Sequence, residues 1–384
     1  MSPSDSGAPR LTAPLRVARS VAVWLSAIAG TGVLAVLALT ALLLAGGYDA
    51  ERALRALWEG SLGSSYAFLS ATLVRATPLI LSGLAVALAF RAGVLNIGAE
   101  GQLLAGAAAA AAVGVTWGGT AGAATPVLAL LAGALAGSLW ALPAAYLRRR
   151  FGVLEVISTI MLNFLALYLV GYLVRGPLQE PLHIYPQTET IPAAAQLSKL
   201  VPGSRLHVGF ALAVLLAGTL WWVLQWTAAG FRLRVSGASP RAAASAALIN
   251  VARTTSAAFL ASGALAGVAG AVEVSGVTYA LYENISPGYG YTAIAVALLA
   301  GLNPLAVIAS GIVFGALEAG ASAMQRDAAV PSVMVSVVEA LIILLLLAMD
   351  RLRLTLGAVT WWNRGGDPSQ SVDPREVSGA EAAT

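Results

Sequence analysis

The sequence predicts an all-α fold: a polytopic transmembrane helical bundle of about 10 spans with both termini cytoplasmic. Three observations predict it. Of the 384 residues, 58% are hydrophobic and only 10% are charged, the chain holds 40 glycines, and apolar runs of membrane-spanning length recur along it. Soluble domains carry about a quarter charged residues, so this chain has too few charges to cover a surface in water. Abundant glycine lets membrane helices pack closely.

The first 20 residues are polar and basic, and we expect them to form a cytoplasmic segment. The apolar stretch from Val21 to about Gly46 is roughly twice as long as the core of a signal peptide, which favours an uncleaved first span. Further apolar runs follow, and the expected spans are 21–46, 66–90, 101–117, 125–147, 154–174, 207–228, 256–276, 289–303, 304–323 and 332–349.

The distribution of arginine supports this count, because cytoplasmic loops of membrane proteins are enriched in basic residues. With ten spans, the inside segments carry Arg10, Arg16, Arg19, Arg91, Arg148, Arg149, Arg150, Arg232, Arg234, Arg241, Arg253, Arg351 and Arg353, against Arg52, Arg55, Arg175, Lys199, Arg205 and Arg326 outside. The run 289–303 is the least certain, because it is short and ends at Asn303–Pro304, which is also consistent with a broken or re-entrant element.

Three regions follow from this reading: a cytoplasmic N-terminal segment 1–20, a transmembrane domain 21–350, and a polar cytoplasmic tail 351–384 that we expect to be disordered. The Pro-rich outside segment 175–206 is expected to be an ordered coil or a short helical cap. The inside segment 229–255 is expected to carry a surface helix, because Ser239 can cap it and Pro240 suits its first position. The string GALAG occurs at Gly133–Gly137 and again at Gly263–Gly267.

Polar residues within or beside the spans are the candidates for a solute pathway. A charged group at membrane depth costs about 2.5–3.5 kcal/mol on insertion scales, so it faces a cavity, a partner or an interface. We interpret Asn96, Glu100, Glu155 and Asn163 as polar pathway or gating positions. Capping of helix ends, or bridging between helices, is the alternative, and it applies above all to Glu155 behind the Arg148–Arg150 run.

The sequence lacks the residues that several classes of protein require for their function. A phosphate-binding loop of the G-x-x-x-x-G-K-[ST] type needs a lysine, and Lys199 is the only one, in an unrelated context. We therefore expect no ATP site, no metal site and no catalytic residue in the chain, which argues against an enzyme. The net charge is +4, and the basic residues that produce it lie between the apolar runs. There they orient the helices in the membrane and do not indicate nucleic-acid binding.

Several strings resemble one family. TPLILSGLAVALAFRAGVLNIGAEGQLLAGA (Thr77 to Ala107) is similar to the signature of inner-membrane permease subunits of nucleoside-type ABC importers, in the wider group of simple-sugar and branched-chain amino acid permeases. The resemblance runs from about residue 48 to 350 and includes GVLEVISTIMLNFLALYLV, GFRLRVSGASPRAAASAALINV, SGALAGVAGAVEVSGV and GYGYTAIAVALLAGLNPLAVIASGIVFGAL. Family members commonly have Phe where this chain has Leu95, and Asn where it has Leu154. Because Leu154 lacks the amide of that Asn, a hydrogen bond to the solute at this position is less well supported.

The resemblance implies a multi-pass protein of the bacterial plasma membrane that forms the pathway for nucleoside uptake. It implies three protein partners: a separate ABC ATPase that binds the ATP, a second and different permease, and an extracytoplasmic solute-binding lipoprotein. Its cytoplasmic loop coincides with the surface helix expected at Ser239–Asn250, which we interpret as the ATPase coupling helix. The expected coupling residues are Arg232, Arg234, Ser239, Pro240, Arg241, Ala243, Ala247 and Leu248.

Alternatives remain at this point. Asn and Glu side chains bind ribose hydroxyls as readily as a base edge, so a ribose, simple-sugar or branched-chain amino acid permease fits the same residues. A proton-coupled secondary transporter could use Glu100 or Glu155 as its proton carrier, although the cytoplasmic helix would then have no task. For that helix, the alternative is a solvated loop whose arginines extend to the headgroups.

Overall fold

The computed structural model describes residues 36–245 and 249–331, together with residues 333, 334, 336, 337, 340, 341 and 344. The expected segments 1–20 and 351–384 lie outside this part of the chain, as do most of the first and last expected spans. The chain divides into two compact units. The unit Leu43–Val337 carries the fold described below. Of the other, Met1–Leu42 with Val338–Thr384, the structure describes little beyond a helical stretch from Val36.

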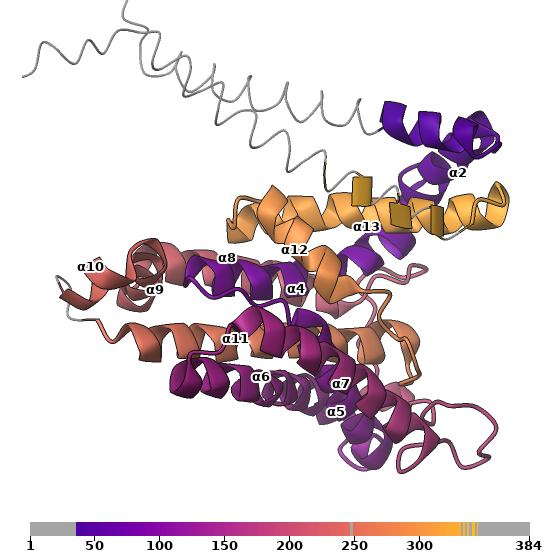
Figure 1. Ribbon diagram of the computed structural model, residues 1–384. Helices are drawn as coiled ribbons and strands as arrows, with labels where there is room; N and C mark the ends of the chain where they lie inside the picture. Colours follow the sequence, from indigo (N-terminus) through magenta and orange to yellow (C-terminus); the bar gives the residue numbers. More distant parts are fainter. Residues whose placement is uncertain are drawn as a thin grey trace, which may run out of the picture. The chain divides into compact units, whose positions relative to one another are not determined.

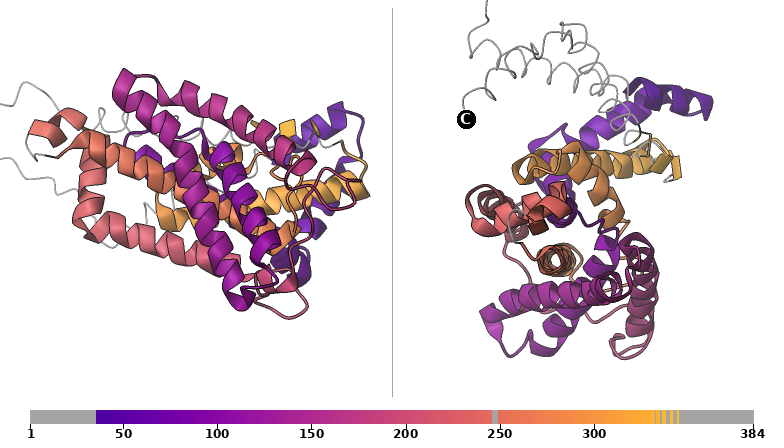
Figure 2. Two further views of the ribbon diagram at one scale, coloured as in Figure 1. Left: turned by 90° about the horizontal axis from the view of Figure 1, so that it is seen from below. Right: turned by 60° about the vertical axis from the view of Figure 1, so that its left-hand side comes forward.

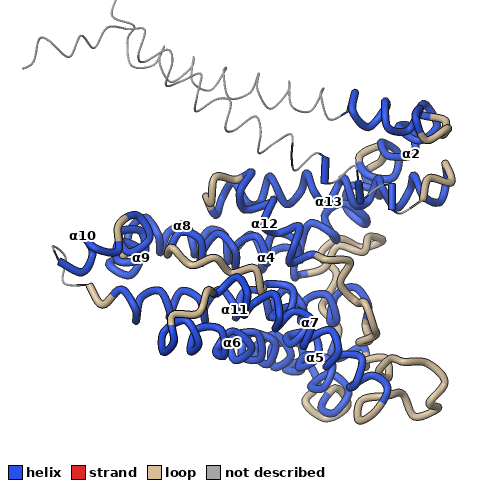
Figure 3. Tube along the Cα trace, in the orientation of Figure 1, coloured by secondary structure: helices blue, strands red, loops and turns tan. Residues whose placement is uncertain are grey.

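The described residues are helical, with coil between the helices and only two isolated β-bridges, Gln187 with Tyr282 and Lys199 with His207 (Figures 1 and 3). The elements are α2 (Ala50–Ser61), α3 (Ser65–Ala67), the π-helix η1 (Phe68–Thr72), α4 (Leu73–Arg91), α5 (Ala99–Trp117), the 3₁₀ turn η2 (Gly122–Ala124), α6 (Thr125–Phe151), α7 (Glu155–Arg175), the 3₁₀ turn η3 (Ala193–Ala195), α8 (Val208–Trp226), α9 (Ala228–Ala238), α10 (Pro240–Ser245), α11 (Val251–Glu273), the π-helix η4 (Val274–Thr278), α12 (Tyr289–Leu299) and α13 (Pro304–Asp327).

Six of the described helices are long and apolar enough to cross a membrane: Ser65–Arg91, Thr125–Phe151, Glu155–Arg175, Val208–Trp226, Val251–Thr278 and Pro304–Asp327. This confirms a polytopic all-α protein. Helix α5 forms where a further span was expected. The 11-residue α12 is about 16 Å long, short of the roughly 30 Å of a bilayer core, so the run 289–303 does not form the full-length span counted for it and matches the broken or re-entrant alternative.

Helices α4 and α11 form the centre of the unit. Helix α4 contacts α11, α12 and α13, and α11 also packs on α5 and α6. The right-hand view of Figure 2 looks nearly along α11 and shows other helices around it. Helix α4 is apolar on all sides and almost wholly buried, as expected of a helix surrounded by others.

The two GALAG strings pack against each other. Gly133 and Gly137 on α6 face Gly263 and Gly267 on α11, so closely that a Cβ at Gly263 would lie 2.6 Å from the carbonyl oxygen of Gly137. A Cβ at Gly267 would overlap the carbonyl oxygen of Gly133, and Gly106 of α5 meets Gly267 in the same way. The repeated string therefore forms a contact in which the backbones of α5, α6 and α11 touch.

The segment 175–206 is a coil with the single short turn η3, as expected. It binds the connection between η4 and α12: Leu281 N donates to Thr188 Oγ1 at 3.0 Å, and Thr188 N donates to the carbonyl oxygen of Leu281 at 2.8 Å. Arg175 at the end of α7 forms an ion pair of 2.8 Å with Glu283. These contacts fix the chain that enters α12.

Candidate functional site

The connection from α4 to α5, residues 92–98, is called the α4–α5 junction below. Arg91 closes α4 and donates from Nε to the carbonyl oxygen of Leu302, just after α12. Gly93 then takes a left-handed backbone conformation with φ +76, which allows the chain to turn back toward Gly98, where α5 begins. The junction thus connects the end of α4 directly to the start of α5.

Asn96 is fully buried at the centre of this junction. Its Nδ2 donates to Gln102 Oε1 and to Ser262 Oγ, both at 2.8 Å, and its Oδ1 accepts from Gly98 N at 3.0 Å. Ser262 in turn donates to the carbonyl oxygen of Ala85 on α4 at 2.6 Å. The network joins α4, α5 and α11, and because the Asn96 amide is satisfied, its role here is to hold the junction.

Glu100 connects the junction to α12. Its Oε2 accepts from Gly290 N at 2.7 Å, and Ser286 bonds to the same carboxylate. Ser286 Oγ also accepts from Gly288 N and Tyr289 N, both at 3.1 Å. A carboxylate is favoured at a helix N-terminus, where backbone N–H groups lack intrahelical partners. The predicted pathway residue Glu100 therefore caps α12 from α5.

Asn163 on α7 holds the other side of the junction. Its Oδ1 accepts from Gly101 N at 2.8 Å, while Nδ2 donates to the carbonyl oxygen of Ile97 at 2.9 Å and to the Tyr291 hydroxyl at 3.2 Å. A Cβ at Gly101 would lie 2.9 Å from Asn163 Oδ1, so α5 and α7 approach closely only because residue 101 is glycine.

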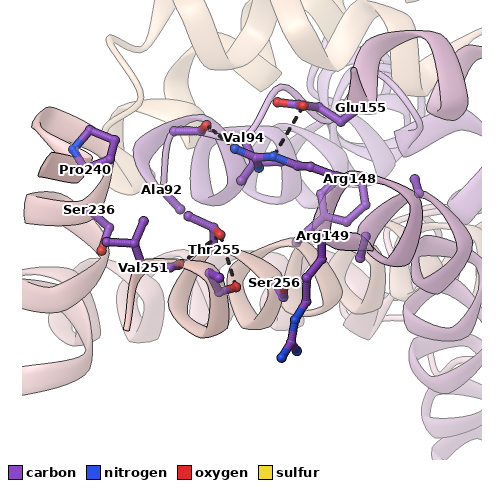
Figure 4. Close-up of a pocket in the computed structure, with 15 residues that line it drawn as sticks. Ala92, Val94, Arg148, Arg149, Glu155, Ser236, Pro240, Val251, Thr255 and Ser256 are labelled. Carbon is purple, nitrogen blue, oxygen red and sulfur yellow. Dashed lines mark hydrogen bonds and ion pairs between the residues drawn. The ribbon is translucent and has the colours of Figure 1, made fainter. Parts of the chain in front are cut away.

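Glu155, at the first turn of α7, reaches the same junction beside the Arg148–Arg150 run. It accepts from Leu95 N at 3.2 Å and pairs with Arg148 at 3.4 Å, while Arg148 also donates to the carbonyl oxygen of Gly93 at 3.4 Å. Figure 4 shows Arg148 between Glu155 and the junction, with Arg149 pointing away. The structure thus brings all four predicted pathway residues to one segment, residues 93–101.

A cavity of about 410 Å³ lies beside these residues (Figure 4). Its walls come from the α4–α5 junction, the end of α6, the start of α11 and the α9–α10 segment. Phe259 and Val94 give it an apolar side, while Arg148 and Glu155 give it a charged one. Ser236 of α9 also lines it, with a buried hydroxyl that has no hydrogen-bond partner among the described residues.

The α9–α10 segment contains the expected coupling residues. Ser239 Oγ accepts from Ala242 N at 3.3 Å, and α10 begins at Pro240, as the sequence predicted. Arg232, Ser239, Pro240 and Arg241 are exposed, and Arg234 is partly buried and bonded to Gln225. Ala243, expected to offer its methyl group to a partner, is instead buried within the chain. Ala247 and Leu248 lie outside the described residues.

Helix α9 was not expected, and it connects the coupling segment to the junction. It begins because Thr227 Oγ1 accepts from Gly230 N at 3.1 Å. Near its end, Gly237 lies against the end of α4, where a Cβ would overlap the carbonyl oxygen of Arg91. A Cβ at Gly93 would in turn lie 3.2 Å from Gly237 Cα. Helix α9 is therefore in direct backbone contact with the α4–α5 junction.

The structure contains a second buried polar group. The sequence contains each of its residues but did not predict that they belong together. Glu273 is buried at the end of α11, and Arg75 lies within an otherwise apolar helix. His207 is also buried, and burial together with Arg205 lowers its pKa to about 4. The signal available from the sequence was an arginine in one span and a glutamate in another, but only the fold shows that the charge of Arg75 acts on Glu273.

A bundle of apolar helices with a buried polar junction, a short helix inside it and an exposed basic surface helix defines an integral membrane transport protein. A family model described as branched-chain amino acid transport system / permease component matches residues 68–348, and the chain belongs to this family. It is accordingly a multi-pass plasma-membrane protein and a transport component, not an enzyme.

Curated relatives agree. The chain is similar to the guanosine ABC transporter permease protein NupP of Bacillus subtilis (38% identity, covering 82% of this chain and 91% of the relative) and to the glucose ABC transporter permease protein TsgB13 of Haloferax volcanii (35%, covering 95% and 97%). It is also similar to a second Bacillus subtilis protein, the guanosine ABC transporter permease protein NupQ (31%, covering 64% and 78%). No solved structure gave a significant match.

Proposed function

We propose that the chain forms part of the solute pathway of an ABC importer for nucleosides, driven by ATP that a separate ATPase binds and hydrolyses. The observation that carries this proposal is the exposed α9–α10 segment, whose Gly237 touches the α4–α5 junction. A partner that moved this segment would move the residues that hold α5, α7 and α12 together. The similarity to guanosine and nucleoside permeases supports the choice of solute.

The complete importer would contain two different permeases, as the similarity to both NupP and NupQ suggests, and an extracytoplasmic binding lipoprotein. We infer about ten spans with both termini cytoplasmic, which places α9–α10 on the ATPase side. The binding protein would dock on residues 48–65, 175–206 and 277–288. Of these, 175–206 and 277–288 are tied together through Thr188 and Leu281. No cofactor would bind to this chain.

The test is uptake by the reconstituted complex: this permease, its second permease, ATPase and binding protein in liposomes. We expect accumulation of labelled guanosine that requires ATP and stops with vanadate. Uptake that persists in vanadate and collapses with an uncoupler would instead identify a proton-coupled transporter.

Sugar import is the second candidate, because the glucose permease TsgB13 resembles this chain over almost its whole length. Competition among guanosine, ribose, glucose and leucine for the same carrier distinguishes the candidates. Uptake of ribose or glucose that guanosine does not reduce would replace the nucleoside by a sugar, and uptake of leucine alone would assign a branched-chain amino acid.

A further inference from the structure

Glu273 is the centre of a buried polar group that lies apart from the α4–α5 junction. It is 4% exposed, and its Oε2 has no hydrogen-bond partner among the described residues. Two cations, Arg75 and Arg205, are near enough to act on its charge. A buried carboxylate oxygen without a hydrogen bond is costly, at about 1–3 kcal/mol or more.

Four helices bring the group together. Arg75 comes from α4, Glu273 from α11, Tyr289 from the start of α12 and Glu318 from α13, and α4 packs on each of the other three. Arg75 is held by Ser322 of α13 at 3.3 Å. Tyr289 is buried and is close enough to respond to the charges of Glu273, Glu318 and Arg75. These four residues are called the Glu273 cluster below.

The backbone beside Glu273 is irregular. Helix α11 passes into the π-helix η4 directly after Glu273, and η4 ends at Tyr279, which has φ +57. Such π-helical turns are frequent at functional sites, because they displace side chains from the regular helical positions. Two further buried polar atoms here lack partners among the described residues, Ser275 Oγ and His207 Nε2, and the His207 ring lies against Gly276.

The chemistry of the cluster fits neighbouring hydroxyl groups. A carboxylate accepts two hydroxyl donors, and a guanidinium donates to the oxygens of the same hydroxyls. The faces of tyrosine rings suit the flat apolar surface of a sugar or a base. We propose that the Glu273 cluster is the subsite for the adjacent hydroxyls of the transported solute, with Glu273 accepting from them and Arg75 donating to them. This rests on the proposed function, in which the hydroxyls are the 2′ and 3′ groups of a nucleoside ribose.

The experiment compares guanosine with 2′,3′-dideoxyguanosine in the reconstituted four-component complex. We expect wild type to prefer guanosine in kcat/KM by about tenfold or more, since one good hydrogen bond is worth about a factor of ten. Glu273→Gln should reduce this preference to within about twofold. Glu273→Asp, which keeps the charge, should retain part of it. The binding protein is the same throughout, so a change in the preference belongs to the permease.

The matched control is Asp327→Asn at the end of α13, an exposed carboxylate outside the segments assigned to the binding protein, whose replacement should leave the preference at the wild-type value. Recovery of the assembled complex by gel filtration separates a specific effect from misfolding. If Glu273→Gln does not assemble, Tyr289→Phe provides the second variant, and its preference should also fall, because it removes one hydroxyl from the cluster.

The outcomes are distinct. An equal loss of guanosine and dideoxyguanosine uptake in Glu273→Gln, or no change in either, overturns the hydroxyl subsite while nucleoside import stands. If wild type imports ribose or glucose and no nucleoside, and Glu273→Gln abolishes its preference for the sugar over its deoxy analogue, the subsite stands and the nucleoside assignment fails. Absence of all ATP-dependent uptake would refute the importer itself.

Discussion

Asn163 of α7 binds two buried backbone groups where the α4–α5 junction enters α5. Replacing it with alanine leaves the buried Gly101 N–H and the Ile97 carbonyl without partners. We expect Asn163→Ala to lower the free energy of unfolding by about 1–3 kcal/mol. Tyr291→Phe removes only the hydroxyl contact and should cost about 1 kcal/mol or less. Thermal unfolding of the purified protein in detergent measures both.

The control for Tyr291→Phe is Tyr168→Phe on the same subunit, because the Tyr168 side chain is 73% exposed and its hydroxyl should contribute little. A midpoint for Asn163→Ala equal to that of wild type would show that water or a rearranged junction satisfies these groups as well as Asn163 does.

His207 gives the protein a predicted sensitivity to acid. Its Nδ1 accepts from Gly209 N at 3.2 Å at the start of α8, which only the neutral ring can do. Its pKa is lowered from 6.5 to about 4 by burial and by Arg205, so between these values the unfolded chain binds the proton more readily. Stability should therefore fall as the pH drops from about 6.5 to 4, by up to about 3 kcal/mol, and be unaffected by this group above that range.

Unfolding midpoints measured across this pH range test the prediction. His207→Asn retains a side-chain acceptor for the start of α8 but does not titrate, so its midpoint should depend less on pH than that of wild type. Identical pH dependence in the two proteins would assign the acid sensitivity to other groups.

At the scale of elements, the contact between α9 and the α4–α5 junction is predicted to carry the work of the ATPase. Gly237→Ala places a methyl group against the Arg91 carbonyl and must separate α9 from α4. We expect uptake per ATP hydrolysed to fall about tenfold, corresponding to about 1.4 kcal/mol of coupling free energy. Parallel measurements of uptake and ATPase activity in proteoliposomes give this ratio.

Gly218→Ala on α8 is the matched control, because a Cβ there meets no atom within 4 Å. It should leave the ratio unchanged. If Gly237→Ala retains the wild-type ratio, or lowers it only as much as Gly218→Ala, the contact of α9 with the α4–α5 junction does not couple ATP hydrolysis to uptake.

Much of the helical content could be predicted from local pattern. The long apolar runs coincide with α4, α6, α7, α8, α11 and α13, and Pro240 marks the start of α10, because length, composition and capping act within a segment. Helices α2 and α9 were missed, since their charged residues are typical of loops. The cap of α12 could not be predicted, because Glu100 and Gly290 are 190 residues apart and only the fold brings them together.

The same distinction applies to the site. The residues Asn96, Glu100, Glu155 and Asn163 were predicted from polarity at membrane depth, and the structure places them around one segment. Their partners were not predictable: Glu100, Glu155 and Asn163 bind backbone groups of other elements, and Asn96 binds the side chain of Ser262 on α11. The grouping of Arg75 with Glu273 depends on the packing of α4 on α11, for which neither sequence segment carries a signal.

For the whole molecule, the sequence offers a direct test of topology, because it contains no cysteine. Single cysteines can be introduced without removing native ones. With about ten spans and cytoplasmic termini, Leu182→Cys should react with an impermeant maleimide added to intact cells. Arg241→Cys and Ser371→Cys should react only after the membrane is opened. Labelling of Ser371→Cys in intact cells would place the C-terminus outside and change the parity of the span count.

Helix α12 also has a consequence for the order of biosynthesis. At about 16 Å it is too short to partition into the bilayer by itself, and its first N–H groups depend on Ser286 and on Glu100 of α5. Only residues 300–303 separate it from α13. We therefore expect α12 to enter the membrane late, together with α13 as a hairpin. A nascent chain that stops after Leu299 should leave this segment accessible to quality-control proteases until α13 has been made.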